Sequence, residues 1–325
     1  MSTLNLRRLR QDEHVRSLTR EIHVRSDQLI QPLFVAEGLT KPAPIPGLTG
    51  VHQETADSLL RQIEHDIDAG VRKFLLFGVP TARSERHIDW SFTAGQIEAI
   101  KARFGRDIWL ATDVCLCSST PHGHCGVLNA EGDHVDNDAS LAELVAAALA
   151  YAKAGADCVA PSDMMDDRIG AIRSSLDGGG CERTVLMSYA VKFQSALYGP
   201  FRLAADAAPK GATRLKDRAT YQLDPARPGD AWLCAQRDAQ QGADILMVKP
   251  GLPCLDIVRR VVDAFHMPTF AFQVSGEYAM IAAAAANGWI DGERAILESL
   301  AGFKRAGCAG VITYFAPRAA ELLGA

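Results

Sequence analysis

The sequence predicts an α/β protein built as a closed (β/α)₈ barrel (TIM barrel) with an extended N-terminal arm. Eight short apolar runs alternate with longer segments of helical period along the 325 residues, as successive βα units do. Four helical segments end at a glycine that precedes a new apolar run, as helix C-caps do; these are Gly70, Gly155, Gly242 and Gly307. Neither G-x-G-x-x-G nor a P-loop follows the first run, which disfavours an open nucleotide-binding sheet.

The strands are expected in short runs of branched and aromatic residues, and the helices in the amphipathic segments between them. The expected strands are Leu29–Val35, Lys73–Gly78, Ile108–Asp113, Cys158–Ser162, Thr184–Ser188, Ile245–Lys249, Thr269–Val274 and Gly310–Phe315. Helices are expected at Thr55–Ala69, Ser140–Ala154, Cys254–Phe265 and Tyr278–Asn287.

Three regions of different character are expected along the chain. Residues 1–25 carry scattered arginines and few apolar side chains, so we expect an arm that packs on a neighbouring subunit and serves oligomerisation. Residues 26–325 would form the catalytic barrel. Within it, the stretch 197–228 is rich in glycine, proline and arginine and lacks periodicity, as active-site lids do. Its arginines suit an anionic substrate, although a solvated basic loop is the alternative.

Composition excludes several classes of partner. A net charge of −5 with 22% charged residues gives no electrostatic footprint for nucleic acid. No run approaches eighteen apolar residues, so no membrane span is expected. The arginine-bearing N-terminus is not followed by the apolar core of a signal peptide, and we expect a cytoplasmic protein whose thiols stay reduced.

A cysteine-rich segment follows the third expected strand. Cys115, Cys117 and Cys125 lie within a stretch that also holds His122 and His124, and zinc is the simplest metal for such soft ligands. Three thiolates leave a coordination position for water or substrate, which favours a catalytic zinc. A structural zinc closed by one of the histidines, or ordinary buried or redox thiols, are the alternatives.

Two lysines stand at neighbouring strand ends, where barrel enzymes carry their chemistry. Lys249 ends an apolar strand and is followed by Pro250, while Lys192 comes just after the preceding expected strand. Burial and mutual repulsion would lower the lysine pKa and free an amine to attack a ketone as a Schiff base. A lysine that extends past the strand end to solvent is the alternative. Other strands end in Asp113, Ser162, Ser275 and Tyr314.

These residues lie in motifs that resemble the porphobilinogen synthase (5-aminolevulinate dehydratase) family. The similarity runs from about Gln31 to Ala316, and its motifs are long, ordered and correctly spaced. They are DVCLC and HGHCG, APSDMMDDRIGAIR, MSYAVKF and LYGPFR, DRATYQLDP, GADILMVKPGLPCLDIVRRV, VSGEYAMI and AANGWID, and ITYFA.

The resemblance implies a homo-octameric (β/α)₈ enzyme that condenses two molecules of 5-aminolevulinate into porphobilinogen with loss of two waters, in tetrapyrrole (heme) biosynthesis. It implies a Schiff base of Lys249 with the first-bound (P-side) substrate and of Lys192 with the second (A-side) substrate. The three cysteines match the zinc-dependent form of the family's metal motif. By the same match, Arg202, Arg218 and Gln222 would hold the A-side carboxylate, Ser275 and Tyr314 the P-side carboxylate, and Asp113 and Ser162 would surround the P-side amino group.

Some positions depart from the family pattern. Residues 119–121, Leu197 and the longer stretch 208–218 leave the conformation of the lid open. Many bacterial relatives bind an activating magnesium through a glutamate whose position is Cys234 here, and a thiol is a poor magnesium ligand. We therefore expect no allosteric magnesium, unless Asp230 or Asp238 supplies the carboxylate.

Two other functions remain compatible with the residues alone. One is a lysine-dependent, class I aldolase-type barrel acting on another keto acid, although a simple aldol reaction needs one amine and this chain offers two. The other is a non-catalytic zinc-binding barrel, which would hold a zinc closed by four protein ligands.

Overall fold

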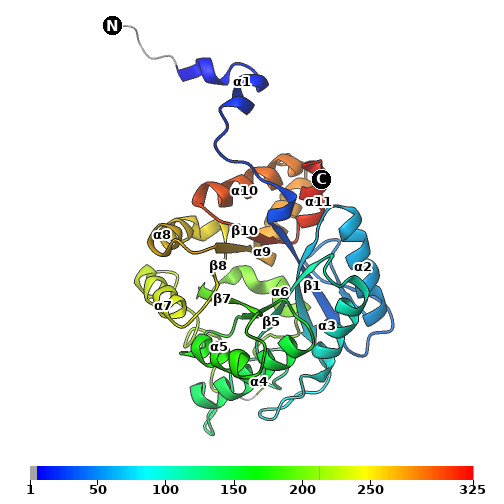
Figure 1. Cartoon of the computed structure of the whole chain (residues 1–325), viewed down its shortest axis with the longest axis vertical. Coiled ribbons are helices and arrows are strands. Elements are labelled where there is room, and N and C mark those ends of the chain that lie inside the picture. Colours follow the sequence, from blue (N-terminus) through cyan, green and yellow to red (C-terminus); the bar gives the residue numbers. More distant parts are fainter. Residues whose placement is uncertain (1–5, 212, 325) are drawn as a thin grey trace.

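A closed barrel of parallel strands forms the centre of the computed structural model, which describes residues 6–211 and 213–324 (Figure 1). The strands follow the order β10-β9-β8-β7-β6-β5-β4-β1, and pairing of β10 with β1 closes the barrel. They are β1 (Leu29–Ala36), β4 (Lys73–Val79), β5 (Trp109–Val114), β6 (Cys158–Pro161), β7 (Val185–Lys192), β8 (Ile245–Lys249), β9 (Thr269–Gln273) and β10 (Gly310–Thr313). The predicted barrel and all eight of its expected strands are confirmed.

Helices surround the barrel, and short elements cover its ends. A hairpin of β2 (Ala43–Pro44) and β3 (His52–Glu54) adds to the edge of β1. The larger helices are α2 (Ala56–Asp68), α3 (Ser91–Phe104), α4 (Asn137–Lys153), α5 (Arg168–Gly178), α7 (Pro228–Gln240), α8 (Leu255–Phe265), α9 (Ser275–Ala286), α10 (Gly292–Ala306) and α11 (Ala316–Leu322). The four expected helices are present, but α4 and α9 begin three residues earlier than expected.

Two apolar layers hold the barrel, because side chains alternate along each strand. On β8, Leu246 and Val248 belong to the cluster between the strands and the helices, whereas Met247 belongs to the cluster inside the barrel. Together the two layers remove the strands from water on both faces. Burial of this kind stabilises a fold by about 25 cal/mol per Å² of apolar surface.

The predicted C-terminal boundary of the fifth barrel strand was wrong. It was expected to end at Ser188, with Lys192 beyond it, but β7 continues to Lys192. The extension was hidden in the sequence because β7 contains an irregularity between Ser188 and Val191, which breaks the alternation on which the strand assignment depended.

The expected lid is less irregular than its composition indicates. Residues 197–228 include most of the 3₁₀ helix η3 (Ala196–Tyr198) and the short helix α6 (Gly199–Ala204), and α7 begins at Pro228. Pro200 lies in the first turn of α6, where the missing N–H of proline costs nothing. The described residues between α6 and α7, 205–211 and 213–227, connect these elements without further helix or strand, apart from the isolated bridge of Leu223 with Phe193.

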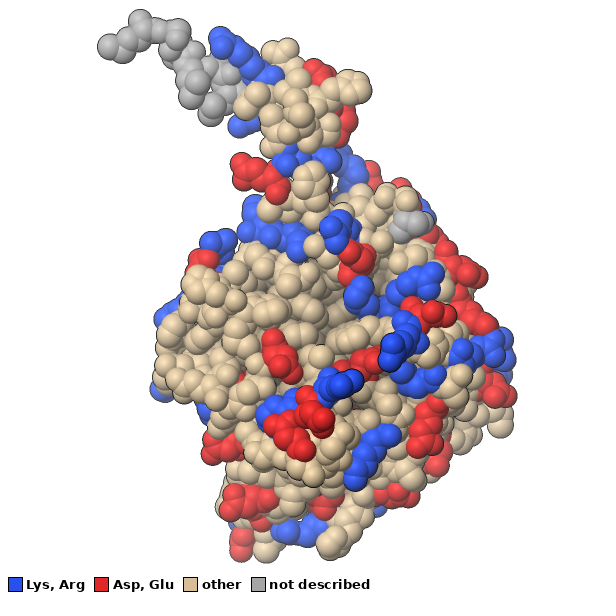
Figure 2. Space-filling model, in the orientation of Figure 1, with Lys and Arg blue, Asp and Glu red and all other residues tan. Residues whose placement is uncertain are grey.

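The N-terminal segment extends away from the barrel (Figure 1). It contains η1 (Leu6–Arg10) and α1 (Glu13–Leu18), and none of residues 7–25 is buried. Figure 2 shows Lys and Arg interspersed with Asp and Glu on the visible face, without a continuous basic surface. Within the described ranges, no helix has both the length and the apolar character needed to cross a bilayer.

Candidate active site

Strand alternation brings polar side chains into the barrel at its C-terminal end. Trp109 and Ala111 of β5 contact the inner apolar cluster, so Asp113 follows them inward by the same alternation. Ser162 follows the inward-facing Ala160 of β6 in the same way. The polar strand ends predicted from the sequence therefore converge where barrel enzymes hold their substrates.

The two lysines are direct neighbours across β7 and β8. Lys192 and Lys249 are Cα partners in the ladder that joins these strands. Both are buried, with 4% and 3% of their surfaces exposed, so neither extends past the barrel to solvent. The alternative of a Lys249 side chain that extends past the strand end to solvent is therefore wrong.

Lys249 lies among aromatic rings. Its Nζ is 4.0 Å from the ring centroid of Phe272, 4.8 Å from that of Phe201 and 5.2 Å from that of Tyr189. Burial, and then the positive charge of Lys192, lower the pKa of Lys249 to about 7. A substantial fraction of this amine is therefore neutral, and nucleophilic, near neutral pH.

Lys192 is held by the end of β6 rather than by aromatic rings. Its ammonium donates a hydrogen bond to the backbone carbonyl of Ser162. Burial raises the pKa of Asp113, while the charges of Lys192 and Lys249 and a hydrogen bond from Ser162 oppose the shift. Asp113, Ser162 and the two lysines thus form one electrostatically connected group.

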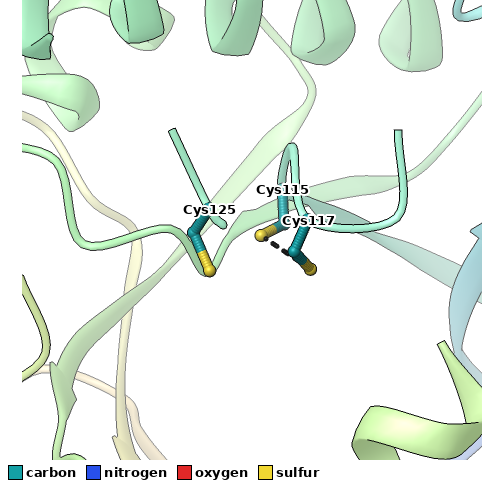
Figure 3. A group of neighbouring side chains, drawn as sticks. All are labelled: Cys115, Cys117 and Cys125. Carbon is teal, nitrogen blue, oxygen red and sulfur yellow. Dashed lines mark hydrogen bonds between the residues drawn. The ribbon is translucent and has the colours of Figure 1, made fainter. Parts of the chain in front are cut away.

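The three cysteines lie beside this group. Their Sγ atoms are all within 4.8 Å of one another, and Cys115 Sγ is 3.3 Å from Cys117 Sγ. Figure 3 shows Cys125 approaching the other two from a separate part of the loop. Hydrogen bonds from Cys115 and Cys117, together with the charges of Arg218 and Lys192, lower the pKa of Cys125 well below its usual range despite its burial. Three convergent sulfur ligands, one of them readily ionised, suit a soft divalent metal ion.

Neither neighbouring histidine joins the thiols. His124 has one ring nitrogen 3.1 Å from the Tyr221 hydroxyl and the other 3.3 Å from the Leu215 carbonyl. His122 Nδ1 accepts from the His124 backbone N–H at 3.0 Å, and its Nε2 lies 3.1 Å from a Glu85 carboxylate oxygen. Among the described residues, the group that could hold a metal ion consists of the three cysteines, so this arrangement gives no support to a zinc closed by histidine.

The segment 197–228, predicted to be a lid, carries three of the predicted substrate-binding residues. Arg218 is buried and donates to the carbonyls of Gly123 and Ala207. The Nε atoms of Arg202 and Arg218, and both amide atoms of Gln222, are buried without a hydrogen-bond partner in the described part of the chain. Buried donors without partners are costly, and a carboxylate ligand would satisfy them.

Ser275 and Tyr314 lie at the ends of β9 and β10. Ser275 is the first residue of α9, and its hydroxyl accepts from the Phe201 N–H at 3.0 Å and donates to the Leu197 carbonyl at 3.2 Å. The hydroxyl of Tyr314 is buried and lacks a partner among the described residues. The Ser275 hydroxyl therefore ties Leu197 and Phe201 to the start of α9, whereas the Tyr314 hydroxyl makes no such bond to the described residues.

Comparisons with known proteins agree on one family. The sequence model described as "Delta-aminolevulinic acid dehydratase" matches residues 3–322. The chain belongs to the delta-aminolevulinic acid dehydratase family. A curated family member from Bradyrhizobium diazoefficiens is 46% identical over 323 residues, covering 98% of this chain and 90% of that protein. Another from Staphylococcus epidermidis is 42% identical over 313 residues, covering 95% of each.

A solved structure of a family member has the same fold. The delta-aminolevulinic acid dehydratase (porphobilinogen synthase) from Toxoplasma gondii, in complex with the reaction product porphobilinogen, has a TM-score of 0.94 and 39% identity to this chain. The match covers 99% of this chain and 92% of that one. A Yersinia pestis dihydropteroate synthase has a TM-score of 0.50 at 13% identity, which shows only a shared fold.

Sequence reasoning missed two groups of residues in this member of the delta-aminolevulinic acid dehydratase family. The aromatic rings around Lys249 come from β7, β9 and the lid, and no local motif joins them. Two-residue alternation along β9 could have predicted that Phe272 faces the barrel interior, because it lies two residues before the inward-facing Val274. The second group is a buried ionic network of Arg168 with Asp163 and Asp238, which no sequence pattern indicated.

Proposed function

We propose that this chain catalyses the asymmetric condensation of two 5-aminolevulinate molecules to porphobilinogen, with loss of two waters. The observation that carries the proposal is the pair of buried, adjacent lysines beside three convergent thiols. Two amines at one site suit a reaction that activates two ketone-bearing substrates, whereas a simple aldol reaction needs one. Family membership and the likeness to a porphobilinogen-bound structure support the same reaction.

In this proposal, each lysine forms a Schiff base with one substrate. The neutral amine of Lys249 attacks the ketone of the P-side molecule, and Lys192 attacks that of the A-side molecule. Asp113 and Ser162 surround the P-side amino group. Arg202, Arg218 and Gln222 bind the A-side carboxylate through the donors that lack protein partners, and Tyr314 binds the P-side carboxylate together with Ser275.

The thiol cluster fits a catalytic zinc, held by Cys115, Cys117 and Cys125. Sulfur ligands favour zinc over magnesium or calcium, and a three-ligand site leaves room for a substrate oxygen. When bound there, zinc supplies Lewis acidity that polarises and orients the A-side substrate. Arg218, close enough to influence the thiols electrostatically, compensates part of their negative charge.

A pyrrole assay tests the proposal. Purified protein incubated with 5-aminolevulinate is expected to form a pyrrole that develops colour, and a chelator is expected to stop the reaction. No pyrrole from zinc-replete protein would contradict the proposal. Turnover of another keto acid would favour the aldolase-type alternative, and tightly bound zinc without any turnover would favour the non-catalytic barrel.

The pH dependence of Schiff-base formation should report the environment of Lys249. Because its pKa is lowered to about 7 by burial and by Lys192, the rate of imine formation is expected to rise as pH increases through about 7. Replacement of Lys192 by methionine removes the like charge and should shift this rise to higher pH. A single-turnover pH profile checks the shift, and unchanged profiles would contradict the electrostatic coupling.

The N-terminal arm is proposed to stabilise a homo-octamer. None of residues 7–25 is buried, and only Val24 among them packs against the core of the barrel, so a surface from another subunit would order most of this segment. Deletion of residues 1–25 is expected to reduce the assembly size measured by sedimentation, while the barrel remains folded. An unchanged octamer after the deletion would contradict this role.

Allosteric magnesium is proposed to be absent. Asp238, one of the two candidate replacements for the family glutamate, accepts hydrogen bonds from Ser188 Oγ at 2.6 Å and Arg237 Nε at 2.9 Å. Asp230 accepts from Arg227 Nε at 2.9 Å. Millimolar magnesium added to zinc-replete enzyme is expected to leave activity and octamer content unchanged. A severalfold activation by magnesium that Asp238→Asn or Asp230→Asn removes would contradict the proposal.

The same proposal sets the cellular context. A soluble small-molecule enzyme that makes a pyrrole belongs in tetrapyrrole (heme) biosynthesis, and we place it in the cytoplasm. Neither nucleic acid nor membrane is required as a partner for the reaction.

A further inference from the structure

We propose that Arg168 is a positioning residue for Lys192. It supports a β-bulge in β7 that turns this lysine into the barrel beside Lys249. The inference rests on the proposed function, because it concerns the geometry of the second amine. It adds a residue that touches neither lysine side chain and lies outside the groups assigned to substrate or metal.

The bulge is visible in the strand register. Ser188 pairs with Leu246, but the next paired residues are Val191 and Val248, followed by Lys192 and Lys249. β7 thus uses three residue steps where β8 uses two. One extra residue on one strand of a pair is the definition of a β-bulge.

The bulge decides which way Lys192 points. Met187 and Tyr189 belong to the inner apolar cluster, whereas Ala190 and Val191 both belong to the outer one. Two consecutive outward residues reverse the alternation, and Lys192 follows on the inside. A strand of regular alternation through the same residues would place Lys192 among the outer helices.

The Arg168 side chain binds the backbone at this bulge. Its Nη2 donates to the Tyr189 carbonyl at 3.2 Å, and its Nη1 donates to the Met165 carbonyl at 3.1 Å. The ladder between β6 and β7 includes only the pairs of Cys158 with Val185 and Val159 with Leu186. The guanidinium therefore supplies hydrogen bonding to β7 beyond the point where its pairing with β6 ends.

Buried carboxylates hold the guanidinium in place. Arg168 is fully buried, and its Nη2 is 3.2 Å from Asp238 Oδ2, while its Nε is 3.5 Å from Asp163 Oδ2. Ser188, at the start of the bulge, donates to Asp238 at 2.6 Å. A buried charge of this kind persists only when paired, and its planar fork gives it one orientation.

The same network reaches Lys192 from its other side. Asp163 directly follows Ser162, whose carbonyl accepts the hydrogen bond from Lys192. Arg168 thus contacts both the backbone of β7, which carries Lys192, and Asp163, which is adjacent to the residue that binds the Lys192 amine. A change at Arg168 is expected to displace Lys192 more than Lys249, which lies on the regular strand β8.

Arg168→Lys tests the proposal, because it keeps the charge but loses the planar fork. Misplacement of a catalytic group by about 1 Å costs roughly 100-fold, so we expect a fall in kcat of that order with a smaller change in KM. Borohydride trapping with 5-aminolevulinate should still label Lys249 but lose the adduct at Lys192. Arg173→Lys is the matched control, because Arg173 also lies on α5 but donates to the Thr184 carbonyl, before the bulge; it should behave as the unaltered enzyme.

Deletion of Ala190 offers a rescue that a purely structural role would not allow. Without Ala190, β7 would alternate regularly from Ser188 onward, and Lys192 would still face the barrel interior opposite Lys249. The strand would then contain no bulge for Arg168 to support. The double variant lacking Ala190 and carrying Arg168→Lys is expected to regain most of the lost kcat and the Lys192 adduct. If Arg168→Lys does not fold, Asp238→Asn, which weakens one anchor of the guanidinium, should show the same selective loss in smaller degree.

Three results would overturn the proposal. The first is a folded Arg168→Lys enzyme with wild-type kcat and normal labelling of Lys192. The second is an Arg168→Lys enzyme that loses labelling equally at Lys192 and Lys249. The third is a folded double variant whose kcat and Lys192 adduct are not restored. The unaltered enzyme separates these outcomes from failure of the proposed function. If it forms no pyrrole from 5-aminolevulinate, the reaction itself is wrong, whereas a pyrrole-forming enzyme with any of the three results contradicts only the role of Arg168.

Discussion

Lys249→Ala is expected to lose essentially all pyrrole formation, by on the order of 10³-fold or more, the scale on which removal of a covalent nucleophile acts. An alanine cannot form the imine through which the P-side substrate is activated. The barrel should remain folded, because the buried amine has a pKa lowered to about 7 and so is not stabilised by its site as an ammonium ion. Initial rates at saturating 5-aminolevulinate and a thermal unfolding curve check both parts.

A lysine outside the barrel interior provides the control. Lys101 of α3 forms an ion pair with Asp157 at 2.8 Å, and Lys101→Ala is expected to keep normal turnover. Partly exposed ion pairs contribute at most about 1 kcal/mol, so this control should also remain folded. A fully active Lys249→Ala enzyme would remove Lys249 from the chemistry.

Cys125→Ser is expected to abolish pyrrole formation together with metal binding. Cys125 is fully buried, and its thiol is the one whose pKa its neighbours lower, so it is the readiest thiolate ligand of the three. Serine is nearly the same size but is a poor zinc ligand. Cys125→Ser should therefore lose both its zinc content and its pyrrole formation, while its thermal stability is largely kept.

Cys181→Ser is the matched control for this loss. Cys181 is a partly exposed free cysteine outside the three-thiol cluster, and its replacement should preserve zinc content and turnover. Full activity in zinc-free protein would contradict the catalytic assignment. A large fall in thermal stability on chelation would instead indicate a structural zinc.

The sequence was sufficient for the barrel because its eight strands are apolar on both faces and separated by capped helices. It also predicted which polar residues meet inside, since the C-terminal ends of parallel strands lie together whatever loops follow them. Asp113 and Lys249 illustrate the point: both lie at the C-terminal ends of regular strands, and two-residue alternation alone directs them inward.

The position of Lys192 on its strand could not be predicted in this way. Two small apolar residues, Ala190 and Val191, conceal the bulge, and the arginine that binds it comes from another element of the chain. The lid was misread for a different reason. Gly199 and Pro200 indicated an interruption of regular secondary structure. Proline is well tolerated in the first turn of a helix, however, and α6 begins at Gly199.

Borohydride trapping followed by peptide mapping tests the central claim most directly, namely that the two buried lysines activate two substrate molecules. Reduction in the presence of 5-aminolevulinate should attach substrate covalently to Lys249 and, once the P-side is filled, to Lys192, because an imine is reducible and a non-covalent complex is not. Adducts at these two lysines are the expected result. Recovery of both unmodified under conditions where pyrrole still forms would contradict the account.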